Sequence, residues 1–304
     1  MECFVSATRA SAPFACRRLT PDDIAAAQRL SAAIGWPHRR EDWRFSIGTG
    51  VGFAAEVDGA LVGTAMCWKF GADQATLGMV IVASGYRRQG IGRALIRCVL
   101  DELGVREITL YATQMSKPLF DATGFEACGT LDQLQGAAFR PPLVALPAGE
   151  RLRPLGANDA EQLAALATEA RGLDRAQVLP VLLGHADGIA LDRDGELLGF
   201  SLFRRFGRGF LIGPVVAADA PDSVRAKALI RHWLALNEGA LVRIDLPDDS
   251  GLRDWLTGLG LTRSETVVKM TRRGNAASPV PKDDASDAGD APLRQFAVIT
   301  QSLT

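Results

Sequence analysis

Residues that build metal sites and disulfide frameworks are scarce in this sequence. Its 304 residues include only three histidines and five cysteines. The histidines, His38, His185 and His232, are far apart and lack ligand spacing, so we expect no metal site. The cysteines are odd in number and unpatterned, which argues against a disulfide-paired secreted scaffold and favours small core residues in a reducing compartment.

Long apolar runs and a strong net charge are also lacking. No stretch approaches the ~20 apolar residues of a membrane span, and the N-terminal residues have no sustained apolar core of the signal-peptide type. The net charge of −1 gives no overall attraction to nucleic acid or to a membrane. We therefore expect a cytoplasmic protein that binds neither. With 47% hydrophobic residues, the chain is long enough for two domains, each with its own core.

The most informative stretch runs from residue 77 to residue 104. A continuous apolar run at residues 77–82 predicts a buried strand, because turn-forming residues follow it at once. After a glycine-containing loop, Ile91, Leu95, Val99 and Leu103 recur every four residues, which predicts a helix that ends at Gly104. The order is therefore strand, loop and helix.

The loop between this strand and this helix, residues 87–92, has the properties of a phosphate-binding site. The first amides of a helix have no intrahelical partner, and the helix dipole favours an anion there. Gly90 and Gly92 leave these amides accessible, and Arg87, Arg88 and Arg93 add positive charge. The loop is neither a P-loop nor a dinucleotide fingerprint. A basic surface turn that only caps the helix is the alternative interpretation.

At these residues the chain resembles the GNAT acetyltransferase superfamily. VIVASGYRRQGIGRAL matches the family's strand, then Arg or Gln, two residues, Gly, one residue, Gly or Ala, and a helix. Downstream, ITLYATQMSKPLFDATGF resembles the next strand and helix of the family and its closing Gly-Phe, here Gly124-Phe125. The resemblance implies an α/β fold with a central mixed sheet flanked by helices, and acetyl-CoA as the cosubstrate.

The same resemblance assigns residues to the cosubstrate. The edge of the strand would pair with the pantetheine arm, and the amides of the loop would hold the pyrophosphate. The residues assigned in this way are Val80, Ile81, Val82, Arg87, Arg88, Gln89, Gly90, Ile91, Gly92, Arg93, Thr113 and Phe120.

The sequence departs from the family pattern at two of these positions. Phe120 stands where many GNAT enzymes carry a tyrosine that protonates the leaving thiolate, and Thr113 stands in place of an asparagine. Because phenylalanine has no proton to give, water or another residue must supply it, or the domain turns over slowly or not at all. Tyr111 cannot be assumed to substitute, because strand alternation directs it to the face opposite Leu110 and Ala112.

The segment at residues 35–50 is rich in aromatic and charged side chains. In the resemblance it borders the acceptor pocket, which makes Trp36, His38 and Trp43 candidate substrate contacts. Asp42 is a weak candidate for the catalytic carboxylate. A short helix packed through Trp43 and Phe45, with its charges in solvent, is an equally good interpretation.

The plan of the first part of the chain repeats in the second. Asp58-Gly59 and Asp194-Gly195 each predict a β-hairpin. The tetrapeptide Ala-Leu-Ile-Arg occurs at residues 94–97 and again at 228–231, an offset of 228 − 94 = 134 residues. This offset puts residues 221–226 in the place of the glycine loop, without its glycines or its arginine pair. The chain thus resembles tandem-GNAT proteins with an intact N-terminal and a degenerate C-terminal domain.

In that group the second half is thought to shape the acceptor site. This makes Asp245, at the end of a predicted strand, a second weak candidate for a carboxylate that binds the amine. A turn-forming role is the favoured interpretation of such an aspartate.

We expect the chain to divide into consecutive segments. Residues 1–14 form a loose lead, 15–145 a GNAT domain with the acetyl-CoA site, 146–274 a degenerate GNAT-like domain, and 275–292 a flexible linker. Residues 293–304 turn apolar again, so they either dock back on the protein or form a free tail.

The sequence therefore predicts an acetyl-CoA-dependent N-acetyltransferase that acts on the amine of a small molecule, as a monomer or a homodimer. No cysteine has an activated setting, so we expect direct transfer in a ternary complex. The alternatives are a catalytically weak or inactive acyl-CoA-binding sensor or scaffold, and a protein N-acetyltransferase. The catalytic base stays open among several carboxylates and His38.

Overall fold

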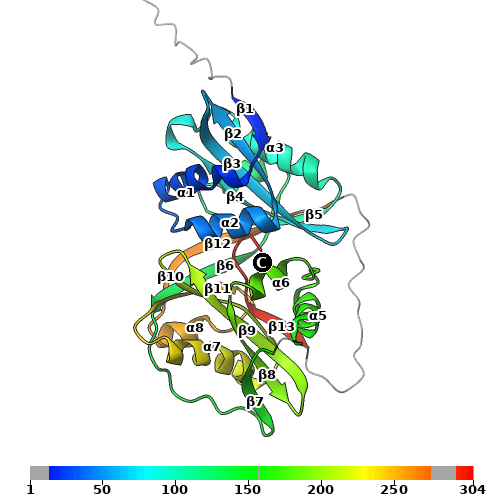
Figure 1. Cartoon of the computed structure of the whole chain (residues 1–304), viewed down its shortest axis with the longest axis vertical. Coiled ribbons are helices and arrows are strands. Elements are labelled where there is room, and N and C mark those ends of the chain that lie inside the picture. The colour runs from blue at the N-terminus through cyan, green and yellow to red at the C-terminus, as the bar shows by residue number, and fades with distance from the viewer. Residues whose placement is uncertain (1–13, 157, 275–291, 304) are drawn as a thin grey trace, which may run out of the picture.

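The computed structural model describes residues 14–156, 158–274 and 292–303, which form two similar halves stacked one above the other (Figure 1). The first half contains β1 (Ala15–Arg18), η1 (Pro21–Asp23), α1 (Ile24–Ala33), α2 (Arg40–Thr49), β2 (Val51–Val57), β3 (Ala60–Phe70), β4 (Gln74–Val82), η2 (Ser84–Tyr86), α3 (Ile91–Leu103), β5 (Glu107–Ala112), α4 (Lys117–Asp121) and β6 (Glu126–Ala137). The second half contains β7 (Glu150–Pro154), α5 (Ala160–Arg171), α6 (Val178–Leu183), β8 (Asp187–Arg193), β9 (Glu196–Phe206), β10 (Gly209–Ala218), η3 (Pro221–Ser223), α7 (Val224–Leu236), β11 (Leu241–Pro247), α8 (Arg253–Gly258) and β12 (Thr262–Arg272), and β13 (Leu293–Ala297) follows.

Local sequence signals account for the elements around the site. The four-residue spacing of α3 buries Ile91, Leu95, Val99 and Leu103, each at most 1% exposed, against the sheet. The helix ends at Gly104, as the sequence predicts. In the first predicted hairpin, Asp58 and Gly59 take positive φ angles of 48° and 76°, and Asp194 and Gly195 do the same in the second.

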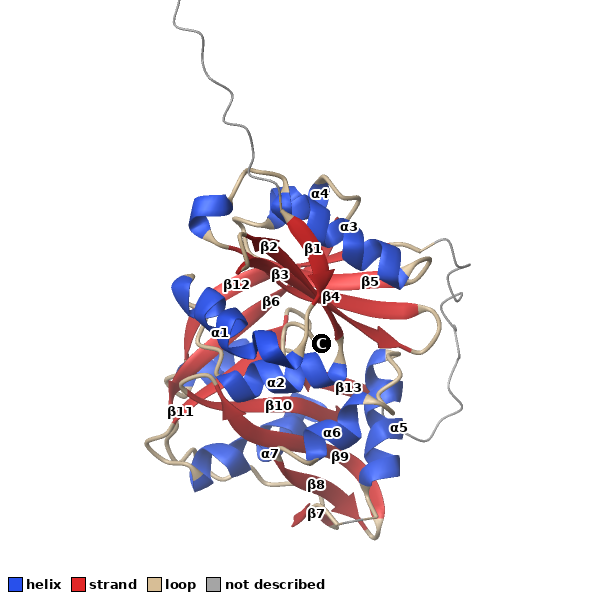
Figure 2. Cartoon of the chain, turned by 45° about the horizontal axis from the view of Figure 1, so that its top comes forward, coloured by secondary structure: helices blue, strands red, loops and turns tan. Residues whose placement is uncertain are grey.

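The strands of both halves join in one continuous mixed sheet, with helices on its faces (Figure 2). The strand order is β1-β2-β3-β4-β5-β12-β6-β11-β10-β9-β8-β7, and β13 pairs with β10. The last strands of the two halves are exchanged: β12 pairs with β5 of the first half, and β6 pairs with β11 of the second. The predicted mixed sheet with flanking helices is confirmed, but the expected sheet in each domain becomes part of a shared one. Strand pairing crosses the expected domain boundary at residue 145. The last strand of each half pairs with a strand of the other half, β6 with β11 and β12 with β5.

In the described part of the chain, three large hydrophobic cores lie on the faces of this sheet, beside a small fourth cluster of Leu131, Val267 and Val298. One packs α3 and α4 on the first half, and another packs α7 and α8 on the second. The third lies between the halves and contains residues of α1 and α2 from the first half and of α5 and α6 from the second. The halves are therefore joined by a common core as well as by a common sheet.

The end of the described chain returns to the space between the halves (Figure 1). After β13, the amide of Val298 donates to the carbonyl of Asp245, and Ile299 and Leu303 are buried in the shared core. The hydroxyl of Thr76 on β4 donates to the carbonyl of Ser302 over 2.6 Å. Most of the predicted lead and linker falls on residues 1–13 and 275–291, outside the described residues. No described helix has the length and apolar character needed to cross a membrane.

Candidate functional site

The loop before α3 presents a helix N-terminus to a cleft. Gly90 is the N-cap and has a φ of +84°, which a side chain would strain. Arg88 has a φ of +61°, so the backbone turns sharply just before the helix. The first amides of α3 thus point out of the helix next to Arg87, Arg88 and Arg93, a geometry suited to a phosphate group.

Beside this loop, β4 has an open edge. Its parallel pairing with β5 covers only Gln74–Thr76 against Glu107–Thr109, so the two strands separate over residues 77–82. The carbonyl of Val82 accepts a hydrogen bond of 3.2 Å from Nε of Arg87, which shows that the edge is available to a polar group other than β5. An extended ligand with amide groups could pair here as an added strand.

A bulge in β4 lies at the middle of this edge. The pairing with β3 shifts between Thr64 and Met66, so that Met79 and Val80 lie opposite Ala65. Met79 has a φ of +53°, and its carbonyl accepts a hydrogen bond of 2.8 Å from the hydroxyl of Thr64. Bulges of this kind redirect backbone groups and often lie beside active sites.

The open edge, the loop and the space between the halves form a continuous cleft of about 1430 Å³. Most of the residues predicted for the site line this cleft. They are Trp36, His38, Asp42, Val80, Ile81, Val82, Arg87, Arg88, Gly90, Gly92, Arg93, Thr113 and Phe120.

The other predicted residues do not line the cleft. Trp43 is fully buried, and its indole N–H donates to the hydroxyl of Ser31 over 3.1 Å, so it holds α2 against α1 instead of meeting a substrate. Ile91 is a core residue of α3, and the side-chain amide of Gln89 donates to the carbonyl of Gly85. Asp245 is also fully buried.

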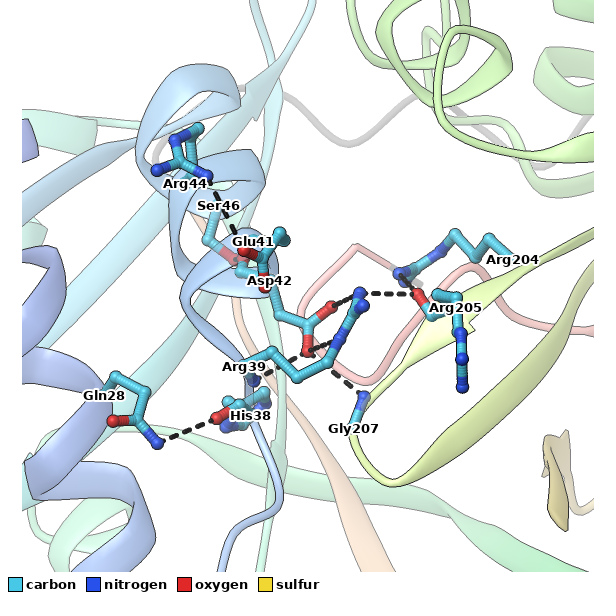
Figure 3. A network of polar contacts seen from close by, with 10 residues as sticks. All are labelled: Gln28, His38, Arg39, Glu41, Asp42, Arg44, Ser46, Arg204, Arg205 and Gly207. Carbon is cyan, nitrogen blue, oxygen red and sulfur yellow. Dashed lines mark hydrogen bonds and ion pairs between the residues drawn. The ribbon is translucent and has the colours of Figure 1, made fainter.

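Asp42 lies in the cleft wall, and its carboxylate braces the two halves (Figure 3). It accepts hydrogen bonds from the backbone N, Nε and Nη2 of Arg39, at 2.8, 3.2 and 3.0 Å, and from the amide of Gly207 at 3.1 Å. Arg39 also donates to the carbonyl of Arg205 over 3.0 Å. With its oxygens occupied in this way, Asp42 has a contact pattern that favours a structural role over proton transfer.

Asp245 belongs to a row of polar residues across three neighbouring strands. It pairs in register with Gln133 of β6, which pairs in turn with Glu265 of β12, so the three side chains lie on one face of the sheet. Both carboxylate oxygens of Asp245 accept hydrogen bonds of 2.7 Å from Arg243. Asp245 therefore anchors Arg243, which lines the cleft.

Glu265 is the carboxylate of this row that faces the cleft without a partner. It is partly buried, and among the described residues it forms no ion pair. Burial raises the pKa of Glu265, Arg243 opposes this effect, and Asp245 adds to it. No sequence pattern points to Glu265, because it stands alone in a strand and reaches the cleft only through the exchange of β12.

Comparison with known proteins agrees with this geometry. The model of the acetyltransferase (GNAT) family matches residues 22–125, and that of the acetyltransferase (GNAT) domain matches residues 163–283. The chain belongs to the GNAT acetyltransferases. The uncharacterized N-acetyltransferase YitH of Bacillus subtilis (strain 168) is 27% identical over 254 residues, which cover 82% of this chain and 88% of the relative.

Solved structures share the whole fold of this GNAT protein. A putative acetyltransferase from Pyrococcus horikoshii has a TM-score of 0.74 at 20% identity, over 96% of both chains. A tandem GNAT protein from the clavulanic acid biosynthesis pathway has a TM-score of 0.61 at 19% identity, over 85% of this chain and 98% of that one. The tandem arrangement of two GNAT domains is thus confirmed, and both halves match acetyltransferase models, a family whose members transfer acyl groups from an acyl-CoA.

Near the open edge of β4, the cleft of this GNAT protein has few side chains that could donate a proton to a leaving thiolate. Phe120 lines it and packs edge-on against Phe125, with ring centroids 5.8 Å apart. Tyr111 lies on the face opposite Leu110 and Ala112, as the alternation predicts, and that face borders the cleft. Burial raises the pKa of Tyr111 to about 12, and the neighbouring Arg171 opposes this effect.

Nucleophilic cysteine chemistry has no support in the described part of this GNAT protein. Cys16, Cys67, Cys98 and Cys128 are free thiols, and none of them lines the cleft. Burial is the main cause that raises the pKa of Cys67 to about 12 and that of Cys16 to about 11, so both stay protonated at neutral pH. Within the described residues, no group of three or more His, Cys, Asp and Glu side chains is arranged to hold a metal ion.

The second half of this GNAT protein differs from the first at the N-terminus of the central helix and at the edge of the neighbouring strand. At the N-terminus of α7, Asp222 and Ser223 take the place of the glycine loop, and the carboxylate of Asp222 pairs with Lys227 over 2.7 Å. Pro214, which has no amide hydrogen, stands at the bulge of β10. The pairing of β10 with β11 ends at Ile212, but β13 pairs with residues 215–218 of β10. The edge that is open in the first half is thus covered here by the chain itself.

Proposed function

We propose that the protein is an acetyl-CoA-dependent N-acetyltransferase that acetylates the amine of a small molecule by direct transfer in a ternary complex. The observation that carries this proposal is the open, bulged edge of β4, which leads to the N-terminus of α3 inside one cleft. The cleft lies between the halves and is lined from both, which favours a small acceptor over a protein chain.

The cosubstrate would occupy the first-half part of the cleft. The pantetheine arm would pair with residues 80–82, and its pyrophosphate would accept hydrogen bonds from the amides at the start of α3. For this, the side chain of Arg87 must leave the carbonyl of Val82, where its Nε now donates. The freed guanidinium can then form charged hydrogen bonds with the phosphate groups of the cosubstrate.

Glu265 would act on the acceptor. An amine attacks a thioester only in its neutral form, so a carboxylate must take a proton from the ammonium group directly or through water. Glu265 suits this role, because it faces the cleft, forms no ion pair with any described residue and has a raised pKa. Transfer in a ternary complex then requires no enzyme nucleophile.

The leaving thiolate needs a proton that Phe120 does not supply. The hydroxyls of Thr113 and Ser116 lie 3.0 Å apart, and both residues line the same part of the cleft. These two hydroxyls can transfer a proton from solvent to the thiolate. The presence of Phe120 also favours a second candidate function, an acyl-CoA-binding sensor that catalyses weakly or not at all.

We further propose that only the first half binds the cosubstrate. In the second half, β13 covers the equivalent strand edge, Pro214 removes an amide at the bulge, and Asp222 adds a negative charge near the helix N-terminus. Each of these features disfavours the same ligand. The second half would then contribute the acceptor side of the cleft through β9, β11 and β12.

The test is thiol release and mass spectrometry with acetyl-CoA and a panel of amino acids, amino sugars, polyamines and peptides. We expect turnover with one class of small amine. Gly90→Glu should abolish it, because it strains the backbone at the N-cap of α3 and adds a charge that repels phosphate. Ser223→Glu makes the same change at the N-cap of α7 and should leave turnover unchanged.

The possible outcomes separate the candidate functions. Binding of acetyl-CoA by calorimetry without turnover of any amine would favour the sensor. Acetylation of peptides alone would favour a protein acetyltransferase. Loss of acetyl-CoA binding in Ser223→Glu, with binding intact in Gly90→Glu, would contradict the assignment of the site to the first half.

A further inference from the structure

A buried arginine without a carboxylate partner lies in the second-half wall of the cleft. Arg204, near the end of β9, is 7% exposed and lines the cleft. Within the described residues its guanidinium forms no ion pair, and its Nε has no hydrogen-bond partner. Its one polar contact is a long one of 3.5 Å from Nη1 to the carbonyl of Arg205 (Figure 3).

An unpaired buried guanidinium destabilises a protein unless a ligand supplies the missing negative charge. Buried charges in proteins are normally paired, because the lost hydration of an ion costs several kcal/mol. Burial lowers the pKa of Arg204 to about 10, which still leaves the guanidinium charged at neutral pH. The other contacts of Arg204 are with the faces of Phe45 and Phe206, which hold the guanidinium in place without neutralising it.

Other groups around Arg204 suit the same type of ligand. Arg243 also stacks on Phe206, at 5.2 Å from the ring centroid, compared with 5.1 Å for Arg204. The ring of His38 meets Phe206 edge-on, with ring centroids 5.5 Å apart, and its buried Nδ1 has no hydrogen-bond partner in the described part of the chain. Two guanidinium groups and the imidazole of His38, with its unpartnered Nδ1, thus lie around Phe206 in the wall of the cleft. We call Arg204, Arg243, His38 and Phe206 the anion corner.

We propose that the acceptor is a primary amine that also carries an oxyanion, a carboxylate or a phosphate, and that Arg204 binds this oxyanion in the anion corner. This inference rests on the proposed function, because it adds the acidic end of the acceptor to the amine that Glu265 receives. The two ends match the cleft: among the described residues that line it, Glu265 is the unpaired carboxylate and Arg204 is the unpaired buried guanidinium. In the sheet order β12-β6-β11-β10-β9, the strand of Arg243 and Asp245 lies between that of Glu265 and that of Arg204, which calls for a spacer between amine and acid.

The test compares matched acceptors that differ only in the charge of the distal group. The carboxylate arm uses ω-amino acids of increasing length and their carboxamides, and the phosphate arm uses phosphoethanolamine and ethanolamine. We expect kcat/KM for the acidic member of the best pair to exceed that for the neutral member by about ten- to a hundredfold, as for hydrogen bonds to a charged group. The arm with the larger preference identifies the oxyanion.

Arg204→Met should remove this preference, with the neutral acceptors changed by less than about threefold. Arg205→Gln is the matched control, because Arg205 is the next residue of β9 and is exposed. It should keep the preference. Equal use of acids and amides by the wild type, or a preference that survives Arg204→Met, would overturn the proposal.

Two further measurements keep the result interpretable. If no amine is acetylated, the proposed function fails, and calorimetry of the same pairs with coenzyme A bound tests the anion corner alone. Acid-selective binding that Arg204→Met abolishes supports the corner, and unselective or absent binding overturns it. The melting temperature without ligand should stay equal or rise in Arg204→Met, because an unpaired buried charge is removed. A fall of several degrees would instead assign Arg204 to the fold.

Discussion

At the scale of single residues, Glu265 is the side chain whose proposed role as the base can be tested most directly. We expect Glu265→Gln to lower kcat by about 10²- to 10⁴-fold, the usual contribution of a general base. The KM for acetyl-CoA should change little, because we propose that the cosubstrate binds at β4 and α3. Steady-state kinetics with the best amine measures both constants. Glu126→Gln, at an exposed position of β6, is the matched control and should behave as the wild type.

The pH profile gives a second measure of the same group. Because the pKa of Glu265 is raised, its carboxylate gains a proton at a higher pH than an ordinary glutamate. The rate should therefore fall on the acid side through an apparent pKa above 4.5, and Glu265→Gln should lack this limb. A variant that keeps both the rate and the acid limb would assign the base to another residue.

His38 makes the stability of the protein depend on pH. Burial lowers its pKa from 6.5 to about 4, with Arg243 and Arg204 acting in the same direction and Asp42 opposing them. The fold therefore favours the neutral imidazole. The stability due to this preference is fully present above pH 6.5 and is lost as the pH falls towards about 4. In melting curves between pH 7 and pH 4.5, the wild type should lose more stability than His38→Phe. Parallel curves would contradict the assignment.

At the scale of elements, the end of the chain fits closely against β4. A Cβ atom at Gly78 would lie 2.5 Å from Oγ and 3.0 Å from Cβ of Ser302. Gly78→Ala should thus displace the terminal segment and destabilise the protein by about 1–3 kcal/mol, the usual cost of overpacking. Ser302→Gly removes the clashing atoms, so the double variant should recover much of the loss in a denaturation experiment. An unchanged loss in the double variant would place the strain elsewhere.

The elements differ in how far their own sequence specifies them. The helix α3, the two Asp-Gly hairpins and the open loop were predictable, because spacing, turn residues and glycine conformations are local properties. The exchange of β6 and β12 was not predictable. The alternation of apolar and polar residues determines which face of a strand is buried, but it does not determine which strand pairs with it.

The candidate site shows the same division. The residues of β4 and of the loop follow from one contiguous motif, and most of them line the cleft. Glu265 and Arg204 reach it from strands of the second half, so only the tertiary fold brings them there. Trp43 was misassigned because an aromatic residue on a helix looks the same in sequence whether it faces a pocket or a core.

At the scale of the whole molecule, the two halves should behave as one cooperative unit. Their last strands are exchanged, and a core of residues from both halves lies between them. The loss of one half would leave β5 without β12 and β11 without β6, and would expose that core. Independent unfolding of two domains, which is common in chains of this size, is therefore not expected here.

Calorimetry with and without cosubstrate tests this coupling. We expect a single unfolding transition, and coenzyme A should move all of it, although we propose that the ligand binds only in the first half. At about 100 times the Kd, the added stability is about 2.7 kcal/mol, which corresponds to a rise of several degrees in a protein of this size. Gly90→Glu should keep the single transition and lose the shift, because it changes the binding loop and neither the exchanged strands nor the shared core. Two transitions, of which only one moves with ligand, would show that the shared sheet does not couple the halves, and the acceptor residues of the second half could then not depend on cosubstrate binding in the first.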